Sequence, residues 1–289
     1  MNAATATATP HGVPPATART GPRFGRVVAA ERTKLVSLRS PWWTAAVTVV
    51  VAGVITYLSA EASSGDPGFV PVDSLSTGLM LAQVGPLVLG VLAGAGEFRT
   101  GAFRTSFTAV PRRWPVLVAQ TLVVAAFALV TAVLAAAASV VGILPAAASR
   151  GIAVDLVGGD TPGLLLGMVL FVVGLALLGL ALGALLRRTL PALLAALSLA
   201  LVLPVVLMTV GDPGTDAMGM AVPHRVTVPG ALGTFTPGGA AQLMTTSTSA
   251  GPMPGSPDLG PVGGGLVLAA WVVLLLVVAL VRLRARDAR

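Results

Sequence analysis

The chain has 289 residues, of which 55% are hydrophobic and 10% are charged, and its mean hydropathy is +0.90. Soluble domains carry about 25% charged residues to cover their surfaces, so this composition excludes an ordinary soluble fold. The absence of cysteine excludes disulfides, zinc–thiolate sites and thiol nucleophiles.

The N-terminal segment divides into a tail and a helix. Residues 1–22 consist mostly of Ala, Thr and Pro and predict a disordered tail, because they cannot bury enough apolar surface to become ordered. Residues 23–41 predict a cytoplasmic amphipathic helix that lies on the membrane surface, with basic residues between its apolar ones. The alternative is a basic flank that only sets topology. The apolar residues assigned to this helix are Phe24, Val28, Leu35 and Leu38.

Residues 42–289 predict a transmembrane domain of six helices. A charge at the bilayer centre costs about 2.5–3.5 kcal/mol, so long runs without charge are candidate spans. Each such run is long enough to cross about 30 Å of hydrocarbon, and none shows the alternation of a barrel strand. The fold class is therefore an all-α polytopic membrane protein. The expected spans are about 42–60, 75–96, 115–141, 164–186, 190–210 and 262–281.

Several local signals refine these spans. Ser40 and Pro41 predict the N-cap and first residue of the first helix, and Trp42 and Trp43 predict anchors at the membrane boundary. Pro86 and Pro204 predict kinks in the second and fifth spans. Gly90–Gly94 and Gly179–Gly183 have the spacing that lets helices approach closely, which offers weak support for a dimer face. The polar residues Gln83, Thr131, Ser139 and Ser198 predict interhelical hydrogen bonds, or alternatively a substrate path.

The distribution of basic residues predicts the orientation of the chain. With six spans and the N-terminus inside, 16 of the 18 basic residues fall in cytoplasmic segments, and only Arg150 and Arg225 fall outside. This agrees with the positive-inside rule and predicts that both termini are cytoplasmic. It also explains the net charge of +7 without a nucleic-acid partner, because these residues set topology and meet anionic lipid.

No catalytic, cofactor-binding or metal-ligating set stands out, and the chain is not expected to be an enzyme. Lys34 is the only lysine and follows Thr33, so the phosphate-binding loop of P-loop ATPases is absent. His224 lies near Asp212 and Asp216 in the last outer loop, about residues 211–261, where a solvated histidine is favoured over a metal site. The same loop predicts one short helix near Gly238–Met244.

The loop between the second and third spans places phenylalanines beside arginines, which is typical of a docking surface, although a solvated connector is an equal alternative. It contains Glu97-Phe98-Arg99-Thr100-Gly101, then Phe103, Arg104-Thr105, and Ala109-Val110-Pro111-Arg112-Arg113. Together with Glu31-Arg32-Thr33-Lys34-Leu35 before the first span, this loop resembles type-2 ABC exporter permeases of actinobacteria. Thr236-Pro237-Gly238-Gly239-Ala240 adds a weaker similarity.

The resemblance implies six helices per subunit in a dimer with a second copy or a paralogue, and a separate ABC ATPase subunit that holds ATP and Mg. It also implies that a segment of the second-to-third loop couples the permease to the ATPase, with the 23–41 helix beside it. The residues assigned to coupling are Glu97, Phe98, Arg99, Phe103, Arg104, Arg112 and Arg113. The expected function is thus a permease subunit of an ATP-driven exporter in the bacterial plasma membrane, with an unknown substrate. The alternative is a non-transporting membrane anchor or an accessory subunit of a signalling or immunity complex.

Overall fold

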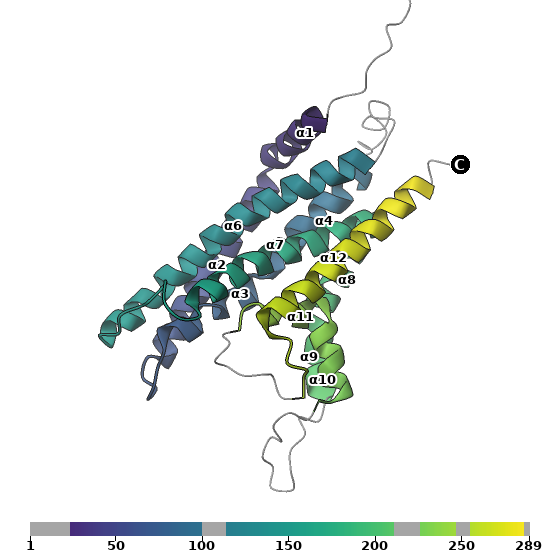
Figure 1. The fold of residues 1–289 in the computed structure, drawn as a ribbon. Coiled ribbons are helices and arrows are strands. Elements are labelled where there is room, and N and C mark those ends of the chain that lie inside the picture. Colours follow the sequence, from purple (N-terminus) through teal and green to yellow (C-terminus); the bar gives the residue numbers. More distant parts are fainter. Residues whose placement is uncertain (1–23, 100–113, 211–225, 247–254, 286–289) are drawn as a thin grey trace, which may run out of the picture.

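A computed structural model describes residues 24–99, 114–210, 226–246 and 255–285, and the predicted tail at 1–22 lies outside these ranges. Within them the chain is helical and contains no β-strand, which confirms the all-α class (Figure 1). The elements are α1 (Phe24–Ser37), α2 (Arg39–Ser63), η1 (Pro71–Ser74), α3 (Thr77–Ala82), α4 (Val84–Arg99), α6 (Trp114–Ser149), α7 (Thr161–Leu186), α8 (Thr189–Leu197), η2 (Ser198–Val202), α9 (Leu203–Val210), α10 (Val228–Phe235), α11 (Pro237–Leu243) and α12 (Gly260–Ala285).

Six helical stretches are long and apolar enough to cross a membrane, as the sequence predicts. They are Arg39–Ser63, Pro71–Gly96, Trp114–Ser149, Thr161–Leu186, Thr189–Leu207 and Gly260–Leu283. The third is longer than predicted: its 36 residues extend about 54 Å at 1.5 Å per residue, well beyond a hydrocarbon core of about 30 Å.

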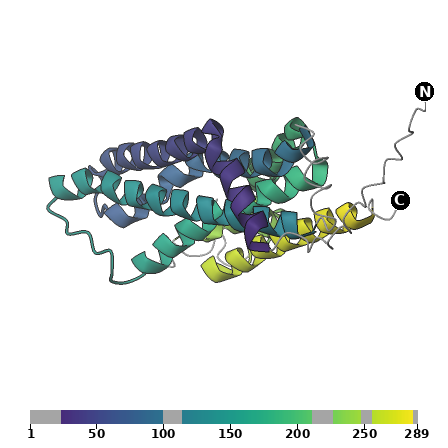
Figure 2. The same cartoon turned by 90° about the horizontal axis from the view of Figure 1, so that it is seen from above.

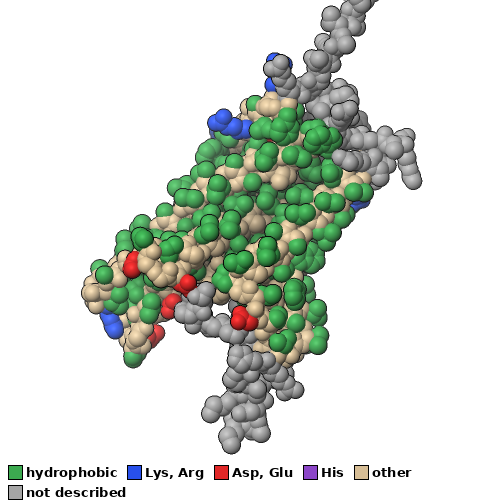
Figure 3. Space-filling view, in the orientation of Figure 1, with side chains coloured by type: hydrophobic (Ala, Val, Ile, Leu, Met, Phe, Trp, Pro, Cys, Tyr) green, Lys and Arg blue, Asp and Glu red, His purple; other side chains and the backbone are tan. Residues whose placement is uncertain are grey.

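The charged residues lie at the two ends of the bundle. Figure 3 shows an apolar flank, with Lys and Arg gathered at the α1 end and Asp and Glu at the opposite end. Arg150, directly after α6, is the exception at the acidic end among the residues that the structure describes. The start of α1 and the end of α12 lie at the same, basic end (Figure 1).

The centre of the bundle is the contact between α4 and α7. Leu175 and Leu178 of α7 are fully buried there, and the predicted close-approach glycines of the two helices face each other. A Cβ on Gly90 would clash with the backbone of Ala176, and a Cβ on Gly179 would clash with the backbone of Leu87. These glycines therefore pack two helices of one chain together, and the suggestion that they form a dimer face is wrong.

An interruption of regular α-helix precedes each of the two prolines that the sequence predicts to kink a span. Pro86 has no N–H to donate to Ala82, and the helix of the second span is interrupted between α3, which ends at Ala82, and α4. Pro204 likewise cannot donate to Ala200, and η2, a π-helical turn, interrupts the fifth span around Ala200.

The predicted interface helix over 23–41 is wrong at its C-terminal end. α1 ends at Ser37, Leu38 is extended with φ −84° and ψ 142°, and α2 begins at Arg39. Leu38 rather than Ser40 is therefore the N-cap of the first span, and its side chain accepts no capping hydrogen bond. Figure 2 shows α1 crossing α6.

Residues 226–246, the described part of the segment predicted to be an outer loop, form a re-entrant helical hairpin of α10 (Val228–Phe235) and α11 (Pro237–Leu243). The predicted short helix is confirmed as α11, and α10 precedes it unforeseen. Backbone N–H of Thr227, at the start of α10, bonds to Gly255, just before α12, and the turn after α10 contacts Trp271, near the middle of α12. Gly264 lies against the carbonyl of Ala240, so α11 returns toward the start of α12. The turn between α10 and α11 is therefore level with Trp271, about 16 Å along α12 from its first residue, Gly260.

Candidate functional site

The buried face of α1 docks this helix onto the bundle. Its buried side chains, Val27, Glu31 and Leu35, are spaced four residues apart and so share one helix face. Val27 packs with Val116 and Ala119 of α6. Leu35 belongs to a second cluster with Leu89 of α4 and Val123 of α6, and Val28 packs against both clusters.

Two of the four residues predicted to form the apolar face do not lie on it. Phe24 is 42% exposed and Leu38, at the joint with α2, is 56% exposed, whereas Val28 and Leu35 pack inward. α1 is therefore a packed part of the bundle, held by one narrow stripe.

Glu31 is the charged side chain on that stripe and is only 7% exposed. Lys34 Nζ donates to its Oε1 at 2.7 Å, one turn further along α1. Taking a carboxylate out of water is expensive unless it is paired, so the ion pair with Lys34 offsets part of the cost of burying Glu31. The spacing of Glu31 from Val27 and Leu35 is the sequence signal that could have revealed its burial.

A cleft of about 440 Å³ opens beside Glu31 and Lys34. α1, the start of α2, α4, α6 and α8 all contribute to its walls. Gln120 Nε2 of α6 donates to the carbonyl of Ala93 in α4 at 2.7 Å and ties two of these walls together. The lining residues are Glu31, Lys34, Leu35, Ser37, Leu38, Ser40, Leu92, Ala93, Gly96, Gln120, Val123, Val124 and Thr189.

The cleft borders the segment assigned to coupling. Glu97, Phe98 and Arg99 follow Gly96 directly and form the last turn of α4, although their side chains are outside the described residues. Phe103, Arg104, Arg112 and Arg113 also lie outside the described part of the chain. The helices on either side of this segment, α4 and α6, are the two that contact α1 through Leu35 and Val27.

The two tryptophans at the start of α2 differ in their contacts. Trp43 is 69% exposed on the flank, as an anchor at the membrane boundary requires. Trp42 Nε1 donates to the carbonyl of Val36 at 3.0 Å, and its ring meets Phe127 of α6 edge-on, with centroids 5.5 Å apart. Trp42 therefore also fixes the joint between α1 and α2 on α6.

The polar residues within the spans mostly serve the structure. Thr56 Oγ1 of α2 lies 3.3 Å from Ser139 Oγ of α6 and accepts from the backbone N–H of Gly78 at 3.3 Å. Thr131 instead donates to the carbonyl of Phe127 within its own helix, and Gln83 donates to that of Met80. Among the four predicted residues, Ser139 makes the interhelical contact in the described structure.

Six apolar helices with charged residues at the bundle ends define this chain as a multi-pass α-helical membrane protein. No protein-family model and no curated protein matches it.

Proposed function

We propose that this chain is the membrane-spanning permease subunit of an ATP-driven exporter of the type-2 ABC class, with ATP hydrolysed by a separate ATPase subunit. The observation that carries the proposal is the docking of α1, with Glu31 buried, against both helices that flank residues 100–113. A partner that moves this segment would act on α4, α6 and α1 together. The motifs that resemble the family lie in these same stretches, around Glu31 and Glu97–Arg113.

Coupling in this proposal is a population shift. ATP closes the ATPase pair, and the contact with Glu97–Arg113 then favours one of two arrangements of the bundle. The second and fifth spans can bend at the interruptions before Pro86 and Pro204, because the regular backbone hydrogen bonding of the α-helix is already broken at these places. ATP and Mg belong to the partner, and no cofactor of this chain is required.

The proposed setting is the bacterial plasma membrane, with both termini in the cytoplasm. The arginine-rich end of the bundle supports this orientation through the positive-inside rule. A second copy or a paralogue completes the transport path, and the basic residues meet anionic lipid rather than nucleic acid.

Copurification and ATPase assays test the proposal. We expect pull-down in mild detergent to recover a P-loop ATPase, and substitution of Arg104→Glu or Phe103→Ala to abolish stimulation of that ATPase in liposomes while insertion is unchanged. Arg188→Glu is the matched control, because it makes the same charge change on an exposed residue at the same end of the bundle. Recovery of this chain alone, or unchanged coupling in both variants, would overturn the proposal.

A non-transporting anchor or accessory subunit is the second candidate. The observation that favours it is that ionisable side chains on the described spanning helices lie near their ends, as with Arg39, Glu61 and Arg282, so the bundle interior offers no charged path. Substrate-dependent stimulation of a partner ATPase would exclude this candidate. Stable assembly with a signalling or immunity complex that lacks such an ATPase would support it.

A further inference from the structure

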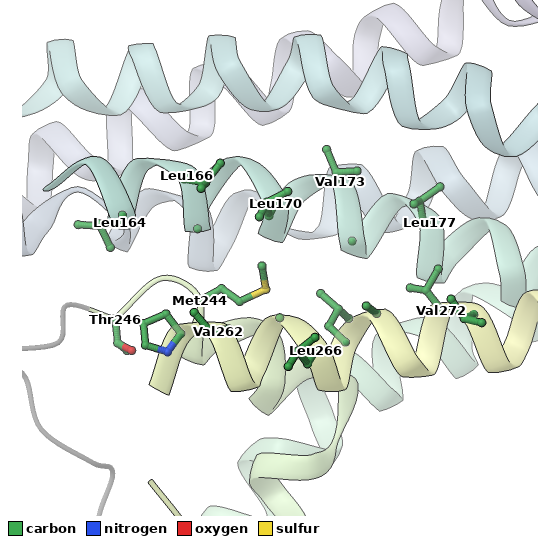
Figure 4. A pocket seen from close by; sticks show the side chains of 18 of the residues that line it. Leu164, Leu166, Leu170, Val173, Leu177, Met244, Thr246, Val262, Leu266 and Val272 are labelled. Atoms are coloured by element: carbon green, nitrogen blue, oxygen red, sulfur yellow. The ribbon is translucent and has the colours of Figure 1, made fainter. Parts of the chain in front are cut away.

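An apolar groove of about 720 Å³ runs between α7 and α12, at the end of the bundle opposite α1. Figure 4 shows Leu164, Leu170 and Val173 on α7, Leu266 and Val272 on α12, and Met244 reaching between the two helices. Leu166 and Leu266 on its rim are 59% and 68% exposed, so the groove opens onto the flank of the molecule.

Glycines create this groove. Gly163, Gly167 and Gly174 of α7 and Gly265 of α12 all line it and leave space where other residues would place side chains. Gly167 is also needed for packing, because a Cβ there would clash with the carbonyl of Met244, whereas a Cβ on Gly174 would displace the end of the Leu268 side chain. At Gly163 and Gly265, in contrast, a side chain would meet open space or ordinary contacts.

In a bilayer, hydrocarbon must fill the groove. An empty groove would forfeit the dispersion contacts of its walls, and water would find almost no polar partners on an apolar lining. Along α7 the groove extends from Gly163 to Leu177, about 21 Å at 1.5 Å per residue. One leaflet contributes about 15 Å to the hydrocarbon core, so an acyl chain of the adjacent leaflet fits the length.

The charged residues at the mouth of the groove indicate which phospholipid head group is attached to the acyl chain in the groove. Asp160 and Thr246 are the polar side chains on the lining, and both lie at the start-of-α7 end. Asp155 and Asp258 lie in the segments that lead into α7 and α12, and Arg150 is the cation described at the end of α6. The described charges on the groove lining and on the segments that adjoin this end of it are thus three carboxylates and one guanidinium, a balance that favours a cationic group over an anionic one.

We propose that the α7–α12 groove is a specific lipid site that holds one acyl chain of a phospholipid with an ammonium head group, such as phosphatidylethanolamine, with the ammonium at Asp160. This site does not depend on the proposed transport function, since a lipid can occupy it whether or not an ATPase binds at the basic end.

Photolabelling in vesicles tests the site with the full chain alone. The probes are phosphatidylethanolamine and phosphatidylglycerol that carry the same diazirine-bearing acyl chain, each at low fraction in unlabelled phosphatidylglycerol, whose head group has no ammonium to compete for the site. We expect phosphatidylethanolamine to label the α7 and α12 peptides several-fold more than the α2 peptide, whose Val50 and Leu58 side chains are exposed to a similar extent as Leu166 and Leu266. Phosphatidylglycerol should not share this preference.

Plugging variants separate the groove from the general lipid surface. Gly163→Leu and Gly265→Leu place a side chain in the groove without a backbone clash and should each reduce labelling of α7 and α12 several-fold. Ala270→Leu adds similar volume to an exposed position of α12 outside the lining and should leave labelling unchanged. Asp160→Asn should abolish the preference for phosphatidylethanolamine, whereas Asp73→Asn at the same end should not.

Three results would overturn the proposal. One is labelling spread evenly over the exposed helices, and another is labelling of α7 and α12 that the plugging variants do not reduce. The third is efficient disulfide formation between copies of a Leu266→Cys variant in vesicles, because a second copy would then cover the groove; the cysteine-free chain makes this measurement unambiguous. Equal labelling by phosphatidylglycerol would refute the assignment of the head group.

Discussion

The indole N–H of Trp271, near the middle of α12, donates to the carbonyl of Phe235 at 2.9 Å. Phe235 ends α10, and the turn to α11 follows it, so this bond links the last span to the deepest part of the re-entrant hairpin. Thr236 caps α11 by accepting from the N–H of Gly239 at 3.1 Å, which satisfies a backbone donor at the same turn. A break in regular helix at membrane depth is tolerated because the protein itself pairs its polar groups.

Substitution of Trp271→Phe should weaken this anchor. It removes the donor but keeps an aromatic ring, and a hydrogen bond of this kind within a membrane protein contributes about 0.6–1.7 kcal/mol. We expect a loss of this size in the free energy of unfolding, measured by denaturation in mixed micelles. Trp43→Phe is the control, because Trp43 is exposed on the flank and should show no comparable loss. Equal losses in both variants would contradict the assigned role of the bond.

Enlargement of Gly179 should separate α4 from α7. A Cβ there would clash with the carbonyl of Leu87, and overpacking a close contact typically costs about 1–3 kcal/mol. We expect Gly179→Ala to lower stability by about this amount in the same denaturation assay. Gly96→Ala in α4 is the control, since open space surrounds that position, and it should be neutral or slightly stabilising. An unchanged stability of Gly179→Ala would argue against the close crossing.

Removal of the Glu31 carboxylate should loosen α1. Val27 and Ala119 belong to one cluster, so a Val27→Cys, Ala119→Cys variant of this cysteine-free chain reports docking by the rate of disulfide formation. We expect Glu31→Ala to lower that rate, because the buried face of α1 then loses the contacts of the glutamate side chain together with its ion pair to Lys34. Arg32→Ala changes the exposed neighbour and should have no effect. A rate unaffected by Glu31→Ala would mean that the apolar stripe alone holds α1.

Loss of the Thr56 hydroxyl should destabilise the contact between α2, α3 and α6. Thr56→Val keeps the shape but leaves the N–H of Gly78 without its acceptor, and an unsatisfied buried donor costs about 1–3 kcal/mol. Thr56→Ser retains the hydroxyl and should recover most of the stability. The free energies of unfolding of the two variants provide the comparison, and a valine variant as stable as the serine variant would exclude a stabilising role for this hydrogen bond.

The sequence by itself determined the six spans, the all-α class and the interruptions before Pro86 and Pro204. These features follow from properties that can be read along the sequence. A charged residue is costly to place in hydrocarbon, so long uncharged segments mark the spans, and proline has no N–H to donate within a helix. The sequence also predicted that basic residues lie mainly at one end of the bundle and acidic residues mainly at the other, because each span takes the chain from one end to the opposite end.

Only the tertiary structure decided which apolar residues face protein and which face lipid. Leu175 is fully buried and Leu166, on the same helix, is 59% exposed, yet in a membrane both positions favour leucine. For the same reason the glycine pairs could not be assigned to an internal contact, and neither the burial of Glu31 nor the α7–α12 groove was foreseen. Lipid and the protein core are similarly apolar, so the amino-acid composition of a segment shows that it enters the membrane but not which of its side chains face protein. The close packing of helices alone decides which helices contact one another.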